Sequence, residues 1–262
     1  RGRYVGVWHP VEGNHMEGLQ NIEDSFLKGI LSTPPTIEVP PSLVTALHTH
    51  IITNGVRWYK HWRKGADEVI PGVDEIKESY PHHATMIHLS RIMEHQKMCR
   101  KVAMECWRFV RDKWSGILSE DDLERESDVL DLWNQQRHRS RHLPKNQVLL
   151  SFNEVLPFMR YAIEISSEPI RRDDPVNNYP EYVDESREEV CFYLINSGPD
   201  GMKLLYGDSS PRQVRAKKSA IFIGGDILSR GLTIEGLSVS YFGRSAGRET
   251  HDTVLQRGRW FG

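Results

Sequence analysis

The residues best suited to bind a ligand form a glycine-containing stretch, residues 224–233, directly after an apolar run at residues 220–223. If that run is a strand, the stretch is the loop at its carboxyl end, where parallel sheets bind ligands. Glycines let backbone amides approach a phosphate, and Ser229 and Arg230 add a hydroxyl and a planar guanidinium suited to phosphate oxygens. A tight turn with Arg230 in a structural ion pair explains these residues equally well. The predicted ligand contacts are Gly224, Gly225, Asp226, Ser229, Arg230, Gly231 and Thr233.

A second candidate segment, residues 252–262, has the pattern of a helix that runs into a glycine-marked turn. Gln256 and Arg259 are three residues apart, so both side chains can face one cleft. The amide of Gln256 would clamp a polar group, and the permanently charged guanidinium of Arg259 would stabilise the oxygens of a transferring phosphoryl group. These two are the predicted catalytic residues. An amphipathic helix with solvated arginines is the alternative interpretation.

Four apolar runs rich in β-branched and aromatic residues are the candidate strands that position these segments. They cover residues 84–89, 190–195, 220–223 and 237–242. The last three are typical of strands buried on both faces, and helical patterns stand between strands. We therefore predict an α/β fold with a parallel sheet and a ligand site at the carboxyl ends of its strands.

Helical patterns lie before and after the first strand. The first pattern opens at Ser42, which follows two prolines and can cap the helix. Its apolar stripe is Leu43, Leu47, Ile51, Trp58 and Trp62. The second pattern, residues 94–114, is expected to direct Met98, Val102, Cys106, Phe109 and Val110 inward. Residues 119–161 are helical again, with a break at Pro157.

The domain organisation follows from these patterns. We expect residues 1–80 to form an irregular and helical N-terminal extension that continues a unit beginning upstream. Residues 81–262 are expected to form the sheet-containing domain, with a helical insertion at about residues 117–188. Residues 171–187 have the composition of a linker.

A basic cluster, Arg137, Arg139, Arg141 and Lys145, concentrates positive charge in a chain whose net charge is −2. We predict that it contacts nucleic-acid phosphates, although a solvated face would have the same composition. A nuclease would need carboxylates or histidines grouped around a cation. His138 and His142 have no carboxylate near them in sequence, so we predict no metal site.

Residues 224–233 and 252–262 together resemble the fifth and sixth signature motifs of superfamily-two helicases. There, a strand, an Arg-Gly loop, another strand and a Gln-x-x-Gly-Arg helix follow one another. The wording L-S-R-G-L-T-I-E-G-L at residues 228–237 and D-T-V-L-Q-R-G-R-W-F-G at residues 252–262 is similar to the Z-one domain family, whose bacterial members are labelled candidate endonucleases. Shorter likenesses at residues 40–43 and 86–91 extend this resemblance to about residues 39–262.

The resemblance implies a RecA-like sheet, the second lobe of a helicase-like enzyme that acts on DNA in bacterial restriction-modification or defence. ATP and Mg²⁺ would be held mainly by a P-loop lobe. The chain contains no Gly-x-x-x-x-Gly-Lys-Ser/Thr sequence, so we expect that lobe elsewhere in the protein and this fragment alone to be inactive. Departures from the helicase pattern at Gly225, at Thr233 and at residues 256–258 argue against assuming strand unwinding.

The composition restricts the cellular setting. Three cysteines at unremarkable spacings argue against a disulfide framework and for a reducing compartment, so we expect the cytoplasm. Cys99 and Cys106 are seven residues apart and are expected to pack in the core on one helix face. No apolar run is long enough to cross a membrane.

Two functional hypotheses follow. The first is a hydrolase lobe that couples ATP hydrolysis to movement along DNA, and the second is a catalytically silent RecA-like scaffold that binds DNA or protein. Gln256 and Arg259 favour the first, because a scaffold needs no Gln and Arg directed into a cleft. Endonuclease activity rests on the family label alone.

Overall fold

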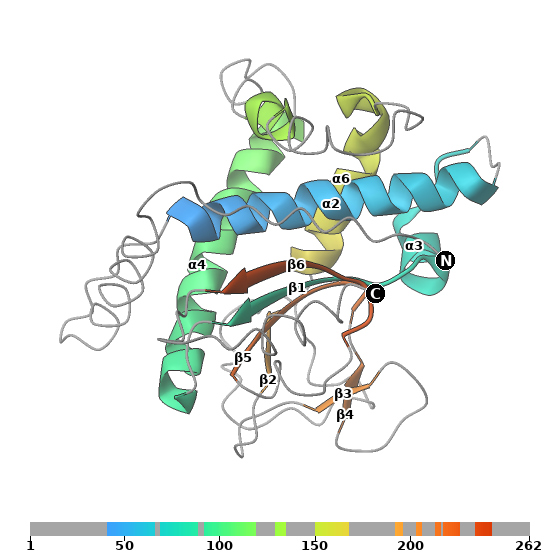
Figure 1. Ribbon diagram of the computed structural model, residues 1–262. Coiled ribbons are helices and arrows are strands. Elements are labelled where there is room, and N and C mark those ends of the chain that lie inside the picture. Colours follow the sequence, from blue (N-terminus) through green and yellow to red (C-terminus); the bar gives the residue numbers. More distant parts are fainter. Residues whose placement is uncertain are drawn as a thin grey trace, which may run out of the picture.

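The computed structural model (Figure 1) describes residues 41–65, 69–88, 92–118, 129–134, 150–167, 192–195, 203–205, 213–215, 217–225 and 234–242. The helices are α2 (Pro41–Gly65), α3 (Val73–Ser79), α4 (Met93–Leu118) and α6 (Phe152–Ser167), and residues 129–134 are also helical. The strands are β1 (His83–His88), β2 (Phe192–Ile195), β3 (Lys203–Leu205), β4 (Gln213–Arg215), β5 (Ser219–Gly224) and β6 (Leu237–Phe242).

Four strands form one parallel sheet in the order β2–β5–β1–β6, while β3 and β4 pair in a separate two-stranded sheet. The four runs predicted as strands are strands, and the α/β fold with a parallel sheet is confirmed. Since β1 and β5 are the inner strands, the segments that follow them begin at the middle of the sheet's carboxyl edge, where parallel sheets bind ligands.

One face of the sheet packs against α2, α4 and α6. Phe192, Leu194, Ile221, Ile223 and Ile87 lie on that face, in one core with the apolar side chains of the helices. Met86, Tyr193 and Phe222 point to the opposite face and are buried as well. Strands β2 and β5 are therefore buried on both faces, as predicted. The same prediction is wrong for the edge strand β6, which is half-buried from Ser238 to Tyr241.

Helix α2 lies across this face and runs opposite to the strands. Near its start, the Ser42 hydroxyl lies 2.9 Å from the Tyr241 hydroxyl of β6. Near its end, the indole Nε1 of Trp58 donates to the carbonyl oxygen of Pro81, which precedes β1, at 2.9 Å. The expected cap at Ser42 is wrong: the helix begins at Pro41, whose fixed φ suits a first helical position.

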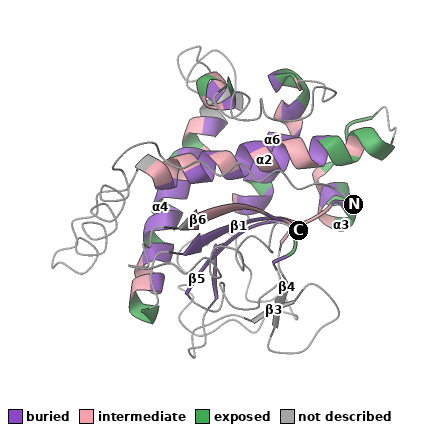
Figure 2. Cartoon of the chain, viewed as in Figure 1, coloured by how far each residue is buried: buried purple, intermediate pink, exposed green. Residues whose placement is uncertain are grey.

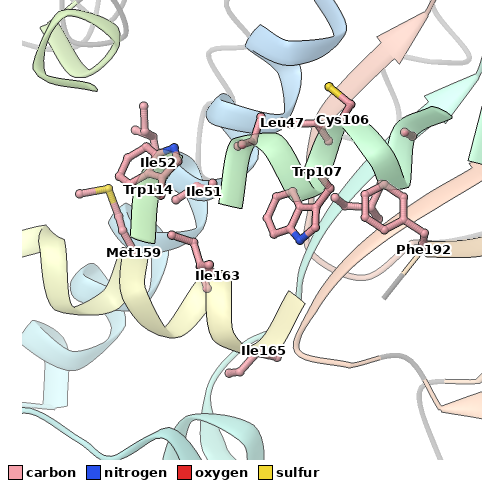
Figure 3. Packing of buried hydrophobic residues seen from close by; sticks show 14 of the residues in the cluster. Leu47, Ile51, Ile52, Cys106, Trp107, Trp114, Met159, Ile163, Ile165 and Phe192 are labelled. Atoms are coloured by element: carbon pink, nitrogen blue, oxygen red, sulfur yellow. The ribbon is translucent and has the colours of Figure 1, made fainter. Parts of the chain in front are cut away.

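Helices α2 and α6 touch at Gly55. A methyl group on Gly55 would overlap the side chain of Met159, so the absence of a side chain sets the distance between the two helices. On both sides of this crossing, Leu43, Leu47, Ile51 and Trp58 are fully buried, which confirms the predicted stripe. Figure 3 shows Leu47 and Ile51 beside side chains of α4 and α6 in the common core.

Helix α6 begins with a capping box. The backbone N–H of Ser151 donates to a Glu154 carboxylate oxygen at 3.1 Å, and the backbone N–H of Glu154 donates to the Ser151 hydroxyl at 3.3 Å. The predicted break at Pro157 is wrong. Pro157 lies inside the helix, which continues to Ser167 with eight buried side chains, so the packing outweighs one missing backbone hydrogen bond.

Helix α4 was predicted correctly in position but not in every inward residue. Val102, Cys106 and Val110 are buried and Met98 is half-buried, whereas Phe109 is 66% exposed. The buried face is centred on Trp107 and Trp114, and Phe109 lies beside it toward solvent. Cys99 and Cys106 are buried as predicted, and burial raises the pKa of the Cys106 thiol to about 11, which keeps it protonated.

Glycine is required in the turn before β6. Gly236 has a φ of +73°, and a methyl group there would overlap the carbonyl oxygen of His82. Its own carbonyl oxygen accepts the N–H of Ala84 at 3.0 Å. This close approach fixes the start of β6 against β1.

A polar cluster centred on His50 joins α2 to the sheet and to α6. Its Nδ1 lies 2.8 Å from the Thr85 hydroxyl of β1, and its Nε2 lies 3.0 Å from the Ser219 hydroxyl of β5. The Ser166 hydroxyl of α6 is 3.2 Å from the same Nε2. Asn54, one turn after His50, donates from Nδ2 to Ser219 Oγ at 2.6 Å.

The imidazole at the centre of this cluster is neutral. Burial lowers the pKa of His50 to about 3. Burial also lowers the pKa of the neighbouring His83, and the positive charge of Arg57 contributes to the same effect. A neutral ring has one donor and one acceptor, so it can complement Thr85 on one side and the serine hydroxyls on the other.

We predict that this cluster makes the fold sensitive to acid. The pKa of His50 is lower in the folded than in the unfolded chain, so protons bind preferentially to the unfolded chain as the pH falls from about 6.5 toward 3. Between pH 6.5 and pH 4, His50 alone should remove about 3 kcal/mol from the free energy of unfolding. His50→Gln, which keeps a donor and an acceptor but cannot titrate, should lose correspondingly less.

Urea unfolding at both pH values measures this difference. His61→Gln is the control, because His61 is an exposed histidine on the same helix. If wild type and His50→Gln lost the same free energy between the two pH values, the neutral buried imidazole would be the wrong explanation.

Candidate functional site at the carboxyl edge of the sheet

The predicted ligand loop starts at the carboxyl edge of the parallel sheet. Gly224 is the last residue of β5 and pairs with Ile195, the last residue of β2. Gly225 follows directly, and both glycines are buried. On the other side of β5, the inner strand β1 ends in His88, which is also buried.

The helix that follows β1 is anchored to the sheet. The guanidinium of Arg100, buried on α4, donates from Nε to the carbonyl oxygen of Phe192 at 2.7 Å. This bond satisfies one N–H donor of a buried guanidinium. Near the start of α4, Ile92 and Met93 are 56% and 44% exposed. In the described part of this edge, a buried strand end is followed in sequence by exposed apolar side chains at the start of α4.

Only two of the predicted site residues belong to the described part of the chain, namely Gly224 and Gly225. The other predicted ligand contacts, Asp226, Ser229, Arg230, Gly231 and Thr233, lie outside the described residues, as do the predicted catalytic pair, Gln256 and Arg259. The basic cluster of Arg137, Arg139, Arg141 and Lys145 lies outside them too.

The contact between His50 and Ser219 has the distance of a base and a nucleophile, but its position excludes catalysis. His50 and Ser219 are 0% exposed and Ser166 is 1% exposed, so no substrate reaches them. Ser219 also begins β5, five residues before Gly224, and so lies roughly 17 Å from the carboxyl edge. The cluster stabilises the fold at a distance from the candidate ligand site.

Sequence reasoning missed this cluster, although a signal was present. His50 and Asn54 are polar residues one turn apart on the apolar face of α2, and Ser219 stands at the head of an apolar strand. Polar residues at core positions of separate elements indicate partners for one another. The pairing itself depends on the tertiary arrangement.

The described residues contain no group of three or more His, Cys, Asp or Glu side chains that could hold a metal ion. His82 and His83, which precede or open β1, have other partners: His82 Nδ1 lies 3.2 Å from the Lys217 carbonyl oxygen, and His83 Nε2 lies 3.3 Å from the Thr53 hydroxyl. No helix in the described ranges is long and apolar enough to cross a membrane.

Comparison with known proteins gives one family match. The model of the Z1 domain matches residues 42–262, which covers α2, the whole parallel sheet and both predicted site segments. No curated protein and no solved structure matches the chain. Because the match extends over most of the sequence and includes every described element, the chain belongs to the Z1 domain family.

Proposed function

We propose that this chain is the second, RecA-like lobe of an ATP-dependent enzyme that acts on DNA in a helicase-like or translocase-like manner. ATP and Mg²⁺ would be held mainly by a P-loop lobe of the same protein, and residues 224–233 would form one wall of the nucleotide site. The observation that carries this proposal is the pair Gly224–Gly225 at the carboxyl end of an inner parallel strand.

The position of this glycine pair supports a phosphate ligand for a physical reason. Beyond the carboxyl end of an inner strand, backbone N–H groups are free of the sheet ladder, and glycine leaves space for a phosphate to approach them. In the sequence, Ser229 and Arg230 follow within six residues and bring a hydroxyl and a guanidinium. A Gln and an Arg spaced to face one cleft then follow at positions 256 and 259.

In this proposal the residues have separate roles in phosphoryl transfer. The loop of Gly224, Gly225, Asp226, Ser229, Arg230, Gly231 and Thr233 orients nucleotide and transmits its state to DNA. Arg259 stabilises charge that develops on the γ-phosphate, and Gln256 positions polar groups beside it. The setting we propose is bacterial restriction or defence in the cytoplasm, with partner proteins of those systems.

The first prediction of this proposal concerns the purified chain without the rest of the protein. Without a P-loop, nothing in it can cradle the β- and γ-phosphates together with Mg²⁺, so we expect no ATP turnover by the purified chain. Phosphate release measures this, with the Arg259→Ala variant of the chain as the background. Turnover above that background would contradict the two-lobe proposal.

The second prediction concerns Arg259 in the full-length protein. Arg259→Ala should reduce ATP turnover by roughly a thousandfold while nucleotide and DNA affinity stay nearly unchanged, because the guanidinium acts mainly in the transition state. Arg257→Ala, two residues away on the same segment, is the matched control and should retain turnover. Arg230→Ala should instead weaken the coupling between nucleotide and DNA binding.

Single-turnover hydrolysis and melting temperature, measured on the same preparation, separate this role from a structural one. If Arg259→Ala lowered the melting temperature but hydrolysed ATP at the normal rate per folded molecule, Arg259 would have no catalytic role. Full-length protein that bound DNA but hydrolysed no ATP would support the scaffold hypothesis instead.

The third prediction concerns the basic cluster at residues 137–145. Replacing Arg137, Arg139 and Arg141 with Gln should reduce the slope of log affinity for DNA against log salt concentration by up to about three, because each lost phosphate contact releases about one counterion fewer. The measurement is fluorescence anisotropy over a series of salt concentrations. An unchanged slope would place this cluster away from the DNA.

A further inference from the structure

The C-terminal end of α2 is a separate concentration of positive charge. Helix α2 contains no Asp or Glu, and its last nine residues carry Arg57, Lys60, Arg63 and Lys64. The whole chain has a net charge of −2, so this end of one helix departs strongly from the average. Lys60, Arg63 and Lys64 are exposed and Arg57 is half-exposed. Figure 2 shows the C-terminal end of α2 largely in the green of exposed residues.

These cations occupy one side of the helix. At 3.6 residues per turn, Arg57, Lys60, Arg63 and Lys64 fall within about a third of the helix circumference, and Arg57 and Lys64 are about 10 Å apart along the axis. Trp58 and Tyr59 face the core and are buried. The segment therefore presents a row of cations backed by a rigid aromatic layer.

The cations of this row also differ from those of α4 in their ion pairing. Within the described part of the chain, none of these four side chains forms an ion pair with a carboxylate. The half-exposed cations of α4 differ: Lys97 pairs with Glu94 at 3.1 Å and Arg108 pairs with Glu105 at 2.7 Å. Arg63 and the Glu154 carboxylate attract each other without forming an ion pair, and Glu154 already accepts the Tyr59 hydroxyl at 3.0 Å and the Ser151 N–H.

Trp62, a half-buried aromatic residue beside this row, is poorly placed to stack with bases. The indole Nε1 of Trp62 donates to the carbonyl oxygen of Val69 at 2.9 Å, and its ring packs 5.7 Å from that of Phe158. The guanidinium of Arg63 lies 5.7 Å from the Trp62 ring centroid, which covers the ring further. A ligand that stacks its bases is thus disfavoured, and a ligand recognised through its charge alone is favoured.

We propose that this end of α2, with Lys60, Arg63 and Lys64 as its main contacts, binds the phosphate backbone of duplex DNA without reading its sequence. Duplex DNA carries about one negative charge per 1.7 Å, so several cations in a row can each neutralise a phosphate. The end of α3 lies beside this part of α2, because the ring of Tyr80, which follows α3, lies 4.8 Å from that of His61. The acidic residues of α3, Asp74, Glu75 and Glu78, therefore limit the cationic surface on that side. The inference rests on the proposed function only in taking DNA as the substrate.

The test compares two triple variants of the chain with the same change in net charge. Lys60→Gln, Arg63→Gln and Lys64→Gln remove the unpaired row, while Lys97→Gln, Arg108→Gln and Arg111→Gln remove paired cations of α4. Affinity for a labelled duplex of mixed sequence is measured without nucleotide from about 50 to 200 mM salt. The α2 variant should lower the slope of log affinity against log salt by about 2 to 3 and bind at least about tenfold more weakly, and the α4 variant should lower the slope by less than about 1.

Several outcomes would overturn the inference. One is an equal change of slope in both triple variants, and another is an unchanged slope with a lowered melting temperature, which would assign the cations to the helix dipole. Loss of binding to anionic vesicles without loss of duplex binding would identify a membrane surface. Lys60→Gln alone, with an expected decrease of about 1, covers the case in which the triple variant does not fold.

The same experiment separates this inference from the proposed function. If the wild-type chain bound no duplex at all, DNA as the substrate of the proposed enzyme would be at fault. If wild type bound the duplex but the α2 variant kept the full slope, only the role of α2 would be wrong. Because no ATP is present, a failure of the ATPase proposal leaves the result unaffected.

Discussion

The placement of α2 depends on one neutral imidazole. His50 contacts hydroxyls from β1, β5 and α6 at distances of 2.8 to 3.2 Å, so three elements far apart in sequence meet at one side chain. Removing that ring would take a hydrogen-bond partner from three buried hydroxyls at once, which costs more than a single hydrogen bond contributes. A few residues further along α2, Gly55 lets α6 approach closely, so the polar contact and the tight helix crossing support the same geometry.

The sequence alone predicts the elements that are specified by a local hydrophobic pattern. Apolar runs of β-branched and aromatic residues predicted all four strands of the parallel sheet, because a strand buried between layers needs little else. The errors occur where tertiary contacts override local preference. Packing of α6 on α2 carries the helix through Pro157, and Tyr241 of β6 engages the hydroxyl of Ser42 that the sequence offered as a cap.

The candidate site could be predicted only in part for a related reason. The end of β5 follows from the pattern, and the structure places Gly224 there beside the end of β2. Gly236 is a different case: only the arrangement of β1 and β6 reveals that a methyl group would overlap the His82 carbonyl oxygen. Sequence alone offered a glycine within the motif, but not the close approach that requires it.

The direction of α2 relates the two candidate surfaces to each other. The helix starts near Tyr241 in the second half of β6 and reaches Pro81 before β1, so it spans the sheet from the carboxyl side to the amino side (Figure 1). The glycine pair at the end of β5 and the cations at the end of α2 thus lie toward opposite edges of the sheet. His50 joins α2 to both inner strands, and α6 packs closely on α2 at Gly55, so tilting α2 against the sheet would break these contacts. Under the proposed function, a movement that nucleotide caused at the carboxyl edge would be transmitted through the packed core to the cationic end of α2, and the proposed contact with the DNA backbone would tolerate such displacement because it requires no register with the bases.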